Sequence, residues 1–185
     1  ENRGLAAAWN QAAIVAAGDI FFFLHNDVML TRHAFDRMQD VLLSQDNIGA
    51  VGPYTNRPRY THQFMGVETY TDIDSLQAAT DELEQSGKPP LPQLFLEDFC
   101  LLMKREAYKA VGSFDEGFLY TGGADCDFSF RMLQAGYRLF AVPTYVHHGQ
   151  GSYRANGWNR QAVHEENKAY FEKIWGFDRG YSTNS

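Results

Sequence analysis

Three short polar segments carry the residues whose types and spacing could support chemistry. The first is His25-Asn26-Asp27, which directly follows the aromatic run DIFFFL. Ligands of open α/β sheets bind just outside the carboxyl ends of strands, so Asp27 is placed to hold a divalent cation that bridges a diphosphate. The alternative is an Asx turn, in which Asn26 or Asp27 only ends the strand.

The second segment is the Gly-Gly turn of GGADCD, which leads into a helix. Asp125 precedes this helix and is the candidate base for an acceptor hydroxyl, because such a base must lie within hydrogen-bonding distance of the proton that it takes. Asp127 and Arg131 are spaced i,i+4 and can pair along the helix surface. The alternative for both acids is capping of the helix and interaction with its dipole, and this alternative accounts for Asp127 best.

The third segment contains the neighbouring histidines His147 and His148, which end a short strand before the glycine-containing run GQGS. Neutral imidazole is a common ligand of transition-metal dications. Successive side chains of a strand point to opposite faces, so only one of the two can point into a given cleft. A hydrogen-bonded structural histidine is the alternative.

The elements that must position these segments alternate along the chain. This alternation predicts a single α/β domain over residues 1–185, with a mostly parallel sheet flanked by helices. Glycine and proline breakers set the boundaries between the elements. Helices are expected at 5–17, 31–44, 74–85, 104–111, 125–135 and 158–175, strands at 19–25, 48–51, 93–103 and 138–142, and a long loop at 54–66.

Composition narrows the class of protein. The 185 residues are 44% hydrophobic, enough for one core, and the net charge of −7 argues against a nucleic-acid binder. Cys100 and Cys126 are too few for a disulfide framework, and no apolar run is long enough to span a bilayer. We therefore expect a cytoplasmic protein, with the inner face of the membrane as a second location. The chain does not begin with Met, and we interpret it as a fragment.

Taken in order, these segments resemble family 2 glycosyltransferases, which have the nucleotide-binding GT-A fold. The resemblance covers nearly the whole chain, and the pieces follow the order of the family. They are NRGLAAAWN from Asn2, AGDIFFFLHNDV from Ala17, IGAVGP from Ile48, FCLLMKRE from Phe99, VGSFDE and GGADCDFSFRMLQAGY around Asp125, VPTYVHHGQGS, and the pattern from Asn167 to Gly176.

The resemblance implies an inverting enzyme that moves a sugar from a nucleoside-diphosphate donor to a hydroxyl acceptor with the help of Mn²⁺ or Mg²⁺. The acceptor would be a saccharide, a lipid-linked molecule or a protein. Metal-ion stabilisation of the departing diphosphate is the chemistry involved. The implied roles are metal binding for Asp27 and His147 (with His148 as the alternative), acceptor activation for Asp125, and contacts to the nucleotide sugar for Asn2, Gly4, His25 and Asn26.

The chain departs from the family pattern at four places. The DxD-type metal motif reads His25-Asn26-Asp27, so its first carboxylate is absent. Ala124 stands where the family usually has a Glu, and Glu97-Asp98 is a candidate for the substitute carboxylate on the acceptor side. The alternative is a solvent-facing pair at the start of a strand. Asp127 is another candidate for the acceptor side. The stretch Tyr153–Trp158 lacks the Gln-x-x-Arg-Trp motif of processive members, which favours transfer of a single sugar. The family's N-terminal strands, which contact the base of the nucleotide, are absent, so this fragment alone can be inactive.

Two other functions compete with this one. A catalytically degenerate relative of the same fold would bind a sugar or a partner without turnover, and Ala124 would mark the loss of catalysis. A nucleotidyltransferase shares the general α/β plan, but it would consume a nucleoside triphosphate and release pyrophosphate. Turnover of a sugar nucleotide distinguishes the three.

Overall fold

The computed structural model describes residues 2–56, 63–64, 70–120, 122–149 and 159–178. Within them, the predicted helices and strands follow one another in the order that the sequence predicts, with two further short strands at Val28–Leu30 and Leu91–Gln93. The helices are α1 (Leu5–Val15), α2 (Ala34–Leu43), α3 (Ile73–Gln85), α4 (Arg105–Val111), α5 (Ala124–Gln134) and α6 (Arg160–Trp175). The strands are β1 (Ile20–Leu24), β2 (Val28–Leu30), β3 (Ile48–Thr55), β4 (Leu91–Gln93), β5 (Cys100–Lys104) and β6 (Arg138–His148).

The six strands form one mixed sheet in the order β1-β5-β3-β6-β2, with β4 also paired to β6. Among the strand pairs of the described residues, only β3–β6 is parallel, so the prediction of a mostly parallel sheet was wrong. Strands β1, β3 and β6 do run in the same direction, as the alternation of helices and strands predicts. Strand β5, however, lies between β1 and β3 and is antiparallel to both. As a result the carboxyl ends of β1, β3 and β6 and the amino end of β5 lie at one edge of the sheet.

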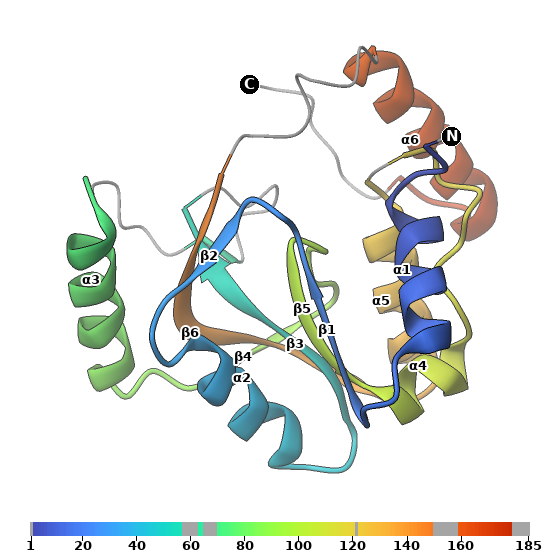
Figure 1. The fold of residues 1–185 in the computed structure, drawn as a ribbon. Coiled ribbons are helices and arrows are strands. Elements are labelled where there is room, and N and C mark those ends of the chain that lie inside the picture. Colours follow the sequence, from blue (N-terminus) through green and yellow to red (C-terminus); the bar gives the residue numbers. More distant parts are fainter. Residues whose placement is uncertain (1, 57–62, 65–69, 121, 150–158, 179–185) are drawn as a thin grey trace.

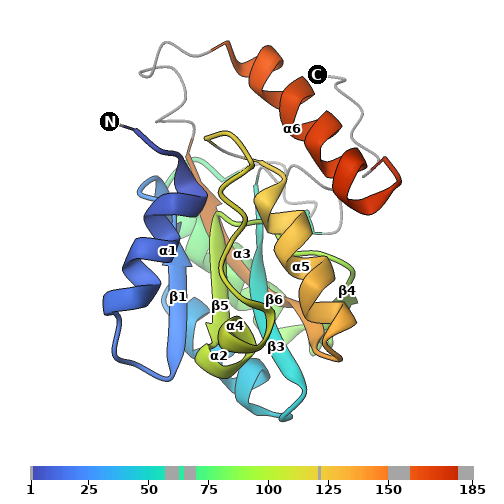
Figure 2. The ribbon, with the colours of Figure 1, turned by 90° about the vertical axis from the view of Figure 1, so that its right-hand side faces the viewer.

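The sheet lies between two layers of helices (Figures 1 and 2). Aromatic side chains of α1, β1 and α5, such as Trp9, Phe23 and Phe128, form the core on one face, and α6 packs there through Phe171. The other face packs against α2 through Met38 and a neighbouring cluster against α3. Alternate residues of β1 serve the two faces, because successive strand side chains point to opposite sides.

Several element boundaries differ from the sequence prediction. The strand expected at 138–142 continues to His148, and the strand expected at 93–103 begins only at Cys100. The short strands β2 and β4 were not predicted, since three residues give too little periodicity to recognise. Helix α3 begins at Ile73 because the side chain of Asp72 caps it through a bond from the Ser75 amide. Most of the predicted loop at 54–66 lies outside the described residues.

None of the helices in the described part of the chain combines the length and the apolar character needed to cross a bilayer.

Candidate metal centre and acceptor-side loop

The turn His25–Asp27 reverses the chain at the carboxyl edge of the sheet. The His25 amide donates to the Phe99 carbonyl at 2.9 Å, which continues the pairing of β1 with β5 by one residue. The Val28 amide donates to the His25 carbonyl at 3.2 Å and closes the turn into β2. A buried aromatic strand therefore delivers three polar residues to one point, as the sequence predicts.

Strand β6 brings its own end to the same point through β2. The antiparallel register pairs Val28 with His148, and the Gly149 amide donates to the Asp27 carbonyl at 2.8 Å. A Cβ atom on Gly149 would lie 3.1 Å from that carbonyl oxygen and 3.2 Å from Asp27 Cβ. A residue without a side chain thus lets the two segments approach closely.

Three half-buried side chains meet at this edge in a group that could hold a metal ion. One ligand atom from each of His25, Asp27 and His148 lies within 4.8 Å of the other two. His148 Nε2 is 3.5 Å from Asp27 Oδ1. Two imidazoles and one carboxylate fit a first-row transition dication, whereas Mg²⁺ prefers oxygen ligands alone. The donor set therefore fits Mn²⁺ better than Mg²⁺.

The neighbouring histidines point to different partners. The ring of His147 contacts the hydroxyl of Tyr70 through Nδ1, and the two rings meet edge to face. His147 pairs with Met29 in the β2–β6 register, while His148 pairs with Val28 next to Asp27. The sequence interpretation preferred His147 as the ligand, and the structure instead brings its alternative, His148, to Asp27. Strand alternation allowed one of the two, but it did not say which.

Asn56 is a residue that the sequence interpretation missed. It follows β3, and its side chain bonds both backbone groups of His148. The His148 amide donates to Asn56 Oδ1 at 2.8 Å, and Asn56 Nδ2 donates to the His148 carbonyl at 3.3 Å. The ring of His148 also stacks on Phe99, with centroids 5.0 Å apart. Asn56 and Phe99 therefore fix the position of this imidazole from two sides.

Asp98 lies at the amino end of β5 and joins the same edge. Its Oδ1 is 3.6 Å from His25 Nε2, and the residue is 9% exposed. The sequence interpretation placed Asp98 on the acceptor side, and the structure places it beside the metal group. Burial raises the pKa of the thiol of Cys100, two residues further along the chain.

Asp125 is the second residue of α5, so the prediction that it precedes the helix was wrong: the helix begins one residue earlier, at Ala124. The residue is almost fully buried, at 2% exposure. Its Oδ1 accepts a hydrogen bond from the Gly123 amide at 3.0 Å. The amino end of α5 lies at the same end of the molecule as the carboxyl end of β1 (Figure 2). The predicted base and the metal group are thus on one side of the fold.

Asp127 has partners within the protein. Arg131 donates to its Oδ2 from Nε at 2.9 Å and from Nη2 at 2.7 Å, and Trp175 Nε1 donates to its Oδ1 at 3.1 Å. The pairing of Asp127 with Arg131 is the one that their spacing predicts. These bonds connect α5 to α6, and they engage both oxygens of the side chain that was a candidate for the acceptor side.

The predicted nucleotide contacts at the start of the chain also have internal roles. Asn2 Oδ1 accepts a bond from the Gly4 amide at 2.9 Å. Gly4 has φ 92°, and a Cβ atom there would lie 2.9 Å from Tyr120 Cα. Gly4 therefore permits close packing of α1 against the loop before α5. Asn26, in the metal-side turn, is exposed.

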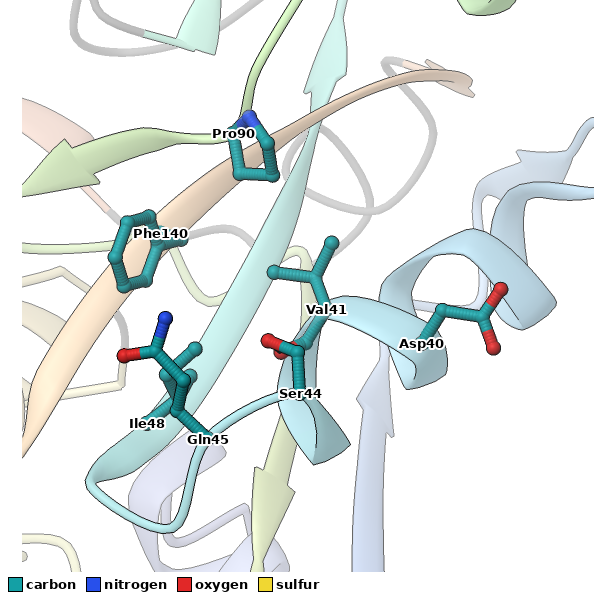
Figure 3. A pocket seen from close by; sticks show the side chains of 7 residues that line it. All are labelled: Asp40, Val41, Ser44, Gln45, Ile48, Pro90 and Phe140. Atoms are coloured by element: carbon teal, nitrogen blue, oxygen red, sulfur yellow. The ribbon is translucent and has the colours of Figure 1, made fainter.

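A separate apolar groove of 360 Å³ lies at the opposite edge of the sheet, between α2, Ile48, Pro90 and Phe140 (Figure 3). Ile48 begins β3, so the groove is at the amino end of this strand and far from its carboxyl end. It does not belong to the metal-side edge.

The fold is similar to that of solved GT-A glycosyltransferases. One is GalNAc-T7 with UDP, GalNAc and Mn²⁺, with a TM-score of 0.61 and 18% identity over 92% of this chain and 37% of that chain. Another is the mannosyltransferase PcManGT from Pyrobaculum calidifontis in complex with GDP-Man and Mn²⁺, with a TM-score of 0.56 and 21% identity over 84% of this chain and 39% of that chain. At these identities the likeness shows the fold.

The family follows from sequence. Residues 1–112 match Glycosyl transferase family 2, and the chain therefore belongs to that family. The O-antigen biosynthesis protein RfbC of Myxococcus xanthus is 27% identical over 163 residues, which are 80% of this chain and 12% of that protein. The chain thus spans only a small part of this relative. The resemblance drawn from the motifs is confirmed for the family and for the fold.

Proposed function

We propose that the protein is a metal-dependent, inverting glycosyltransferase that moves one sugar from a nucleoside-diphosphate donor to a hydroxyl acceptor. The observation that carries this proposal is the convergence of His25, Asp27 and His148 at the carboxyl edge of the sheet. Ligands of α/β folds bind at this edge. Membership of family 2 supports the reaction type, and the Mn²⁺ complexes of the two structural neighbours support the metal.

The three residues would hold Mn²⁺ with coordination positions left for a diphosphate. A bound cation of this kind stabilises the negative charge of a departing diphosphate. Asn56 orients His148 through two backbone bonds, and Asp98 faces His25, so the protein fixes two of the three ligands in advance. Such outer contacts orient metal ligands and raise the affinity of the site.

Asp125 would act as the general base. Its Oδ1 is held by the Gly123 amide, and Oδ2 takes the proton of the acceptor hydroxyl. The acceptor oxygen then forms a bond to the anomeric carbon while the bond from that carbon to the diphosphate breaks, and the configuration at the carbon inverts. The nucleoside diphosphate leaves with the electron pair of the broken bond.

The acceptor class is a glycan that is being built, free or linked to a lipid. The name of the RfbC relative, an O-antigen biosynthesis protein, supports this part of the proposal. Transfer of a single sugar is part of the same proposal. The stretch that bears on it, Tyr153–Trp158, lies outside the described residues.

The test is a screen of UDP- and GDP-linked sugars with the full-length protein, Mn²⁺ and glycan acceptors. We expect release of nucleoside diphosphate together with a product of inverted configuration. Asp125→Asn should abolish transfer and leave Mn²⁺-dependent binding of UDP or GDP intact. Asp74→Asn, on the exposed face of α3, makes the same charge change away from the site and should leave transfer unchanged. Full activity of Asp125→Asn would exclude Asp125 as the base.

A binding protein without turnover is the second candidate, and Ala124 is the observation that favours it. This buried alanine stands immediately before Asp125, where the family resemblance implies a Glu. A binding-only protein would show Mn²⁺-dependent nucleotide binding but no transfer, and no slow hydrolysis of the donor in the absence of acceptor. Detectable hydrolysis that disappears in Asp125→Asn would exclude it.

A further inference from the structure

The geometry points to Asn167 of α6 as a positioning residue for Asp125. This inference rests on the proposed role of Asp125 and extends it to a helix that carries none of the candidate site residues. We propose that Asn167 holds the loop before α5, at Leu119 and at Gly122, in the conformation that presents Asp125. Asn167 touches no reacting atom in this scheme and acts only through the loop.

Within the described part of this loop, the side-chain amide of Asn167 makes three hydrogen bonds to the backbone. The Leu119 amide donates to Oδ1 at 2.7 Å, and Nδ2 donates to the carbonyls of Leu119 at 2.9 Å and of Gly122 at 2.8 Å. The residue is 1% exposed. A side-chain amide can donate and accept at once, so Asn167 satisfies both backbone groups of Leu119 and spans the segment up to Gly122.

The loop needs such an external restraint because its backbone is unusual. Tyr120 has φ 49°, and Gly122 and Gly123 have φ 81° and 106°. A bulky residue in the left-handed region is strained by about 1–3 kcal/mol and keeps this conformation only when its surroundings impose it. Asp125 then bonds back to the Gly123 amide, so the conformation of the loop sets the direction of its carboxylate.

The loop is held from two sides. On the side of α1, the Leu5 amide donates to the Tyr120 carbonyl at 2.8 Å, next to the close approach of Gly4. On the other side is α6, which lies across this end of the molecule (Figure 2). Among the described residues, Asn167 of α6 bonds to the backbone of Leu119 and Gly122.

Helix α6 has further anchors, so Asn167 can be changed without detaching the helix. Tyr170 donates to Asp115 Oδ2 at 3.1 Å, Trp175 donates to Asp127, and Phe171 is fully buried in the core. These anchors hold α6 to the segment before the loop and to α5. Loss of Asn167 is therefore expected to loosen the loop more than the helix.

The experiment compares Asn167→Ala with Tyr170→Phe in the full-length protein. Asn167→Ala should lower kcat by about 10- to 100-fold, because small misplacements of a catalytic group cost this much. The KM for the donor and the affinity for Mn²⁺ should stay near the wild-type values, since the metal ligands lie on other elements. Tyr170→Phe removes a hydrogen bond of the same helix to Asp115 but not the loop bonds, and it should leave kcat close to wild type.

Asn167→Asp provides an isosteric variant for the case that Asn167→Ala does not fold. It keeps the acceptor for the Leu119 amide and loses both donated bonds when ionised. A protonated carboxyl can donate one of them again, so kcat relative to wild type should rise as the pH falls. Dividing by the wild-type value removes the pH dependence that the two enzymes share. A ratio that is constant with pH would contradict the loop mechanism.

Amide hydrogen exchange separates this proposal from the proposed function. Peptides that cover residues 117–123 should exchange faster in Asn167→Ala and Asn167→Asp, while peptides from β1 and β6 should not change. If the wild type transfers no sugar but the variants show this exchange pattern, the proposed glycosyltransferase function is wrong, while the restraint of the loop by Asn167 is supported. Unchanged exchange at 117–123, or unchanged kcat in an active enzyme, would overturn the role of Asn167.

Discussion

The metal-side edge and the loop that precedes Asp125 are built in different ways. At the metal side, His25 and Asp27 share one turn, and strand register places His148 beside them. On the acceptor side, an irregular backbone is held by α1 and by Asn167, which lies 48 residues from Leu119 in sequence. Sheet register fixes the first region, whereas individual long-range hydrogen bonds fix the second. Substitutions in one region should therefore leave the other region intact, so that Mn²⁺ affinity and kcat can be lost separately.

The largest effect should come from the metal side. Asp27→Ala removes the carboxylate of the group, and Mn²⁺ affinity should fall by more than about 100-fold, beyond what loss of an outer contact costs. Titration calorimetry or the electron paramagnetic resonance of free Mn²⁺ measures this. Asp40→Ala removes an exposed acid beside the groove at the opposite edge and should bind Mn²⁺ as the wild type does. Equal affinities of the two variants would remove Asp27 from the site.

A smaller loss should follow from Asn56→Ala, which leaves all three ligands in place. The variant removes the two hydrogen bonds from the Asn56 side chain to the amide and the carbonyl of His148. We therefore expect an Mn²⁺ affinity about 10- to 100-fold below that of the wild type. Asn47→Ala, an exposed position before the other end of β3, is the matched control. If Asn56→Ala binds Mn²⁺ like Asn47→Ala, the position of His148 does not depend on Asn56.

On the acceptor side, Gly4→Ala should lower stability and kcat but not Mn²⁺ affinity. The new Cβ would lie 2.9 Å from Tyr120 Cα, and the residue has φ 92°. We expect a loss of about 2–4 kcal/mol in the free energy of unfolding, as strain and overpacking add. Gly136→Ala, with φ 86° and open space around the Cβ, carries the strain alone and should lose about 1–2 kcal/mol. Denaturant unfolding compares them, and equal losses would contradict the close contact with Tyr120.

The smallest effect concerns α3, which belongs to neither region. Bonds from Ser75 lower the pKa of Asp72 below its ordinary value of 3.8. The ionised carboxylate therefore stabilises the helix start above that value, and this contribution is lost as the pH falls through the lower pKa of the folded state. Asp72→Ala should lower Tm slightly at pH 7, and the difference from wild type should vanish at the lowest pH at which both remain folded. A change in the Mn²⁺ affinity of Asp72→Ala would contradict the separation of α3 from the metal site.

Sequence reasoning reached the fold class and the family. It also placed a polar turn after the run DIFFFL, because His25-Asn26-Asp27 is a local signal, and the metal-binding role of this turn stays a prediction. It did not reach the direction of β5, which depends on where the strand inserts in the sheet. It also missed Asn56 and preferred His147, since the register of β2 against β6 decides which histidine faces Asp27. Asn167 was visible only as part of a family pattern, and its bonds to the loop depend on the tertiary fold.

The neighbouring histidines give the most direct test of the account. Mn²⁺ binding is measured for the wild type, His148→Ala and His147→Ala. Each variant lacks one imidazole, and the two substituted positions are adjacent in β6. The account predicts that His148→Ala loses at least about 100-fold in affinity while His147→Ala stays close to wild type. Loss of binding in His147→Ala with retention in His148→Ala would contradict it.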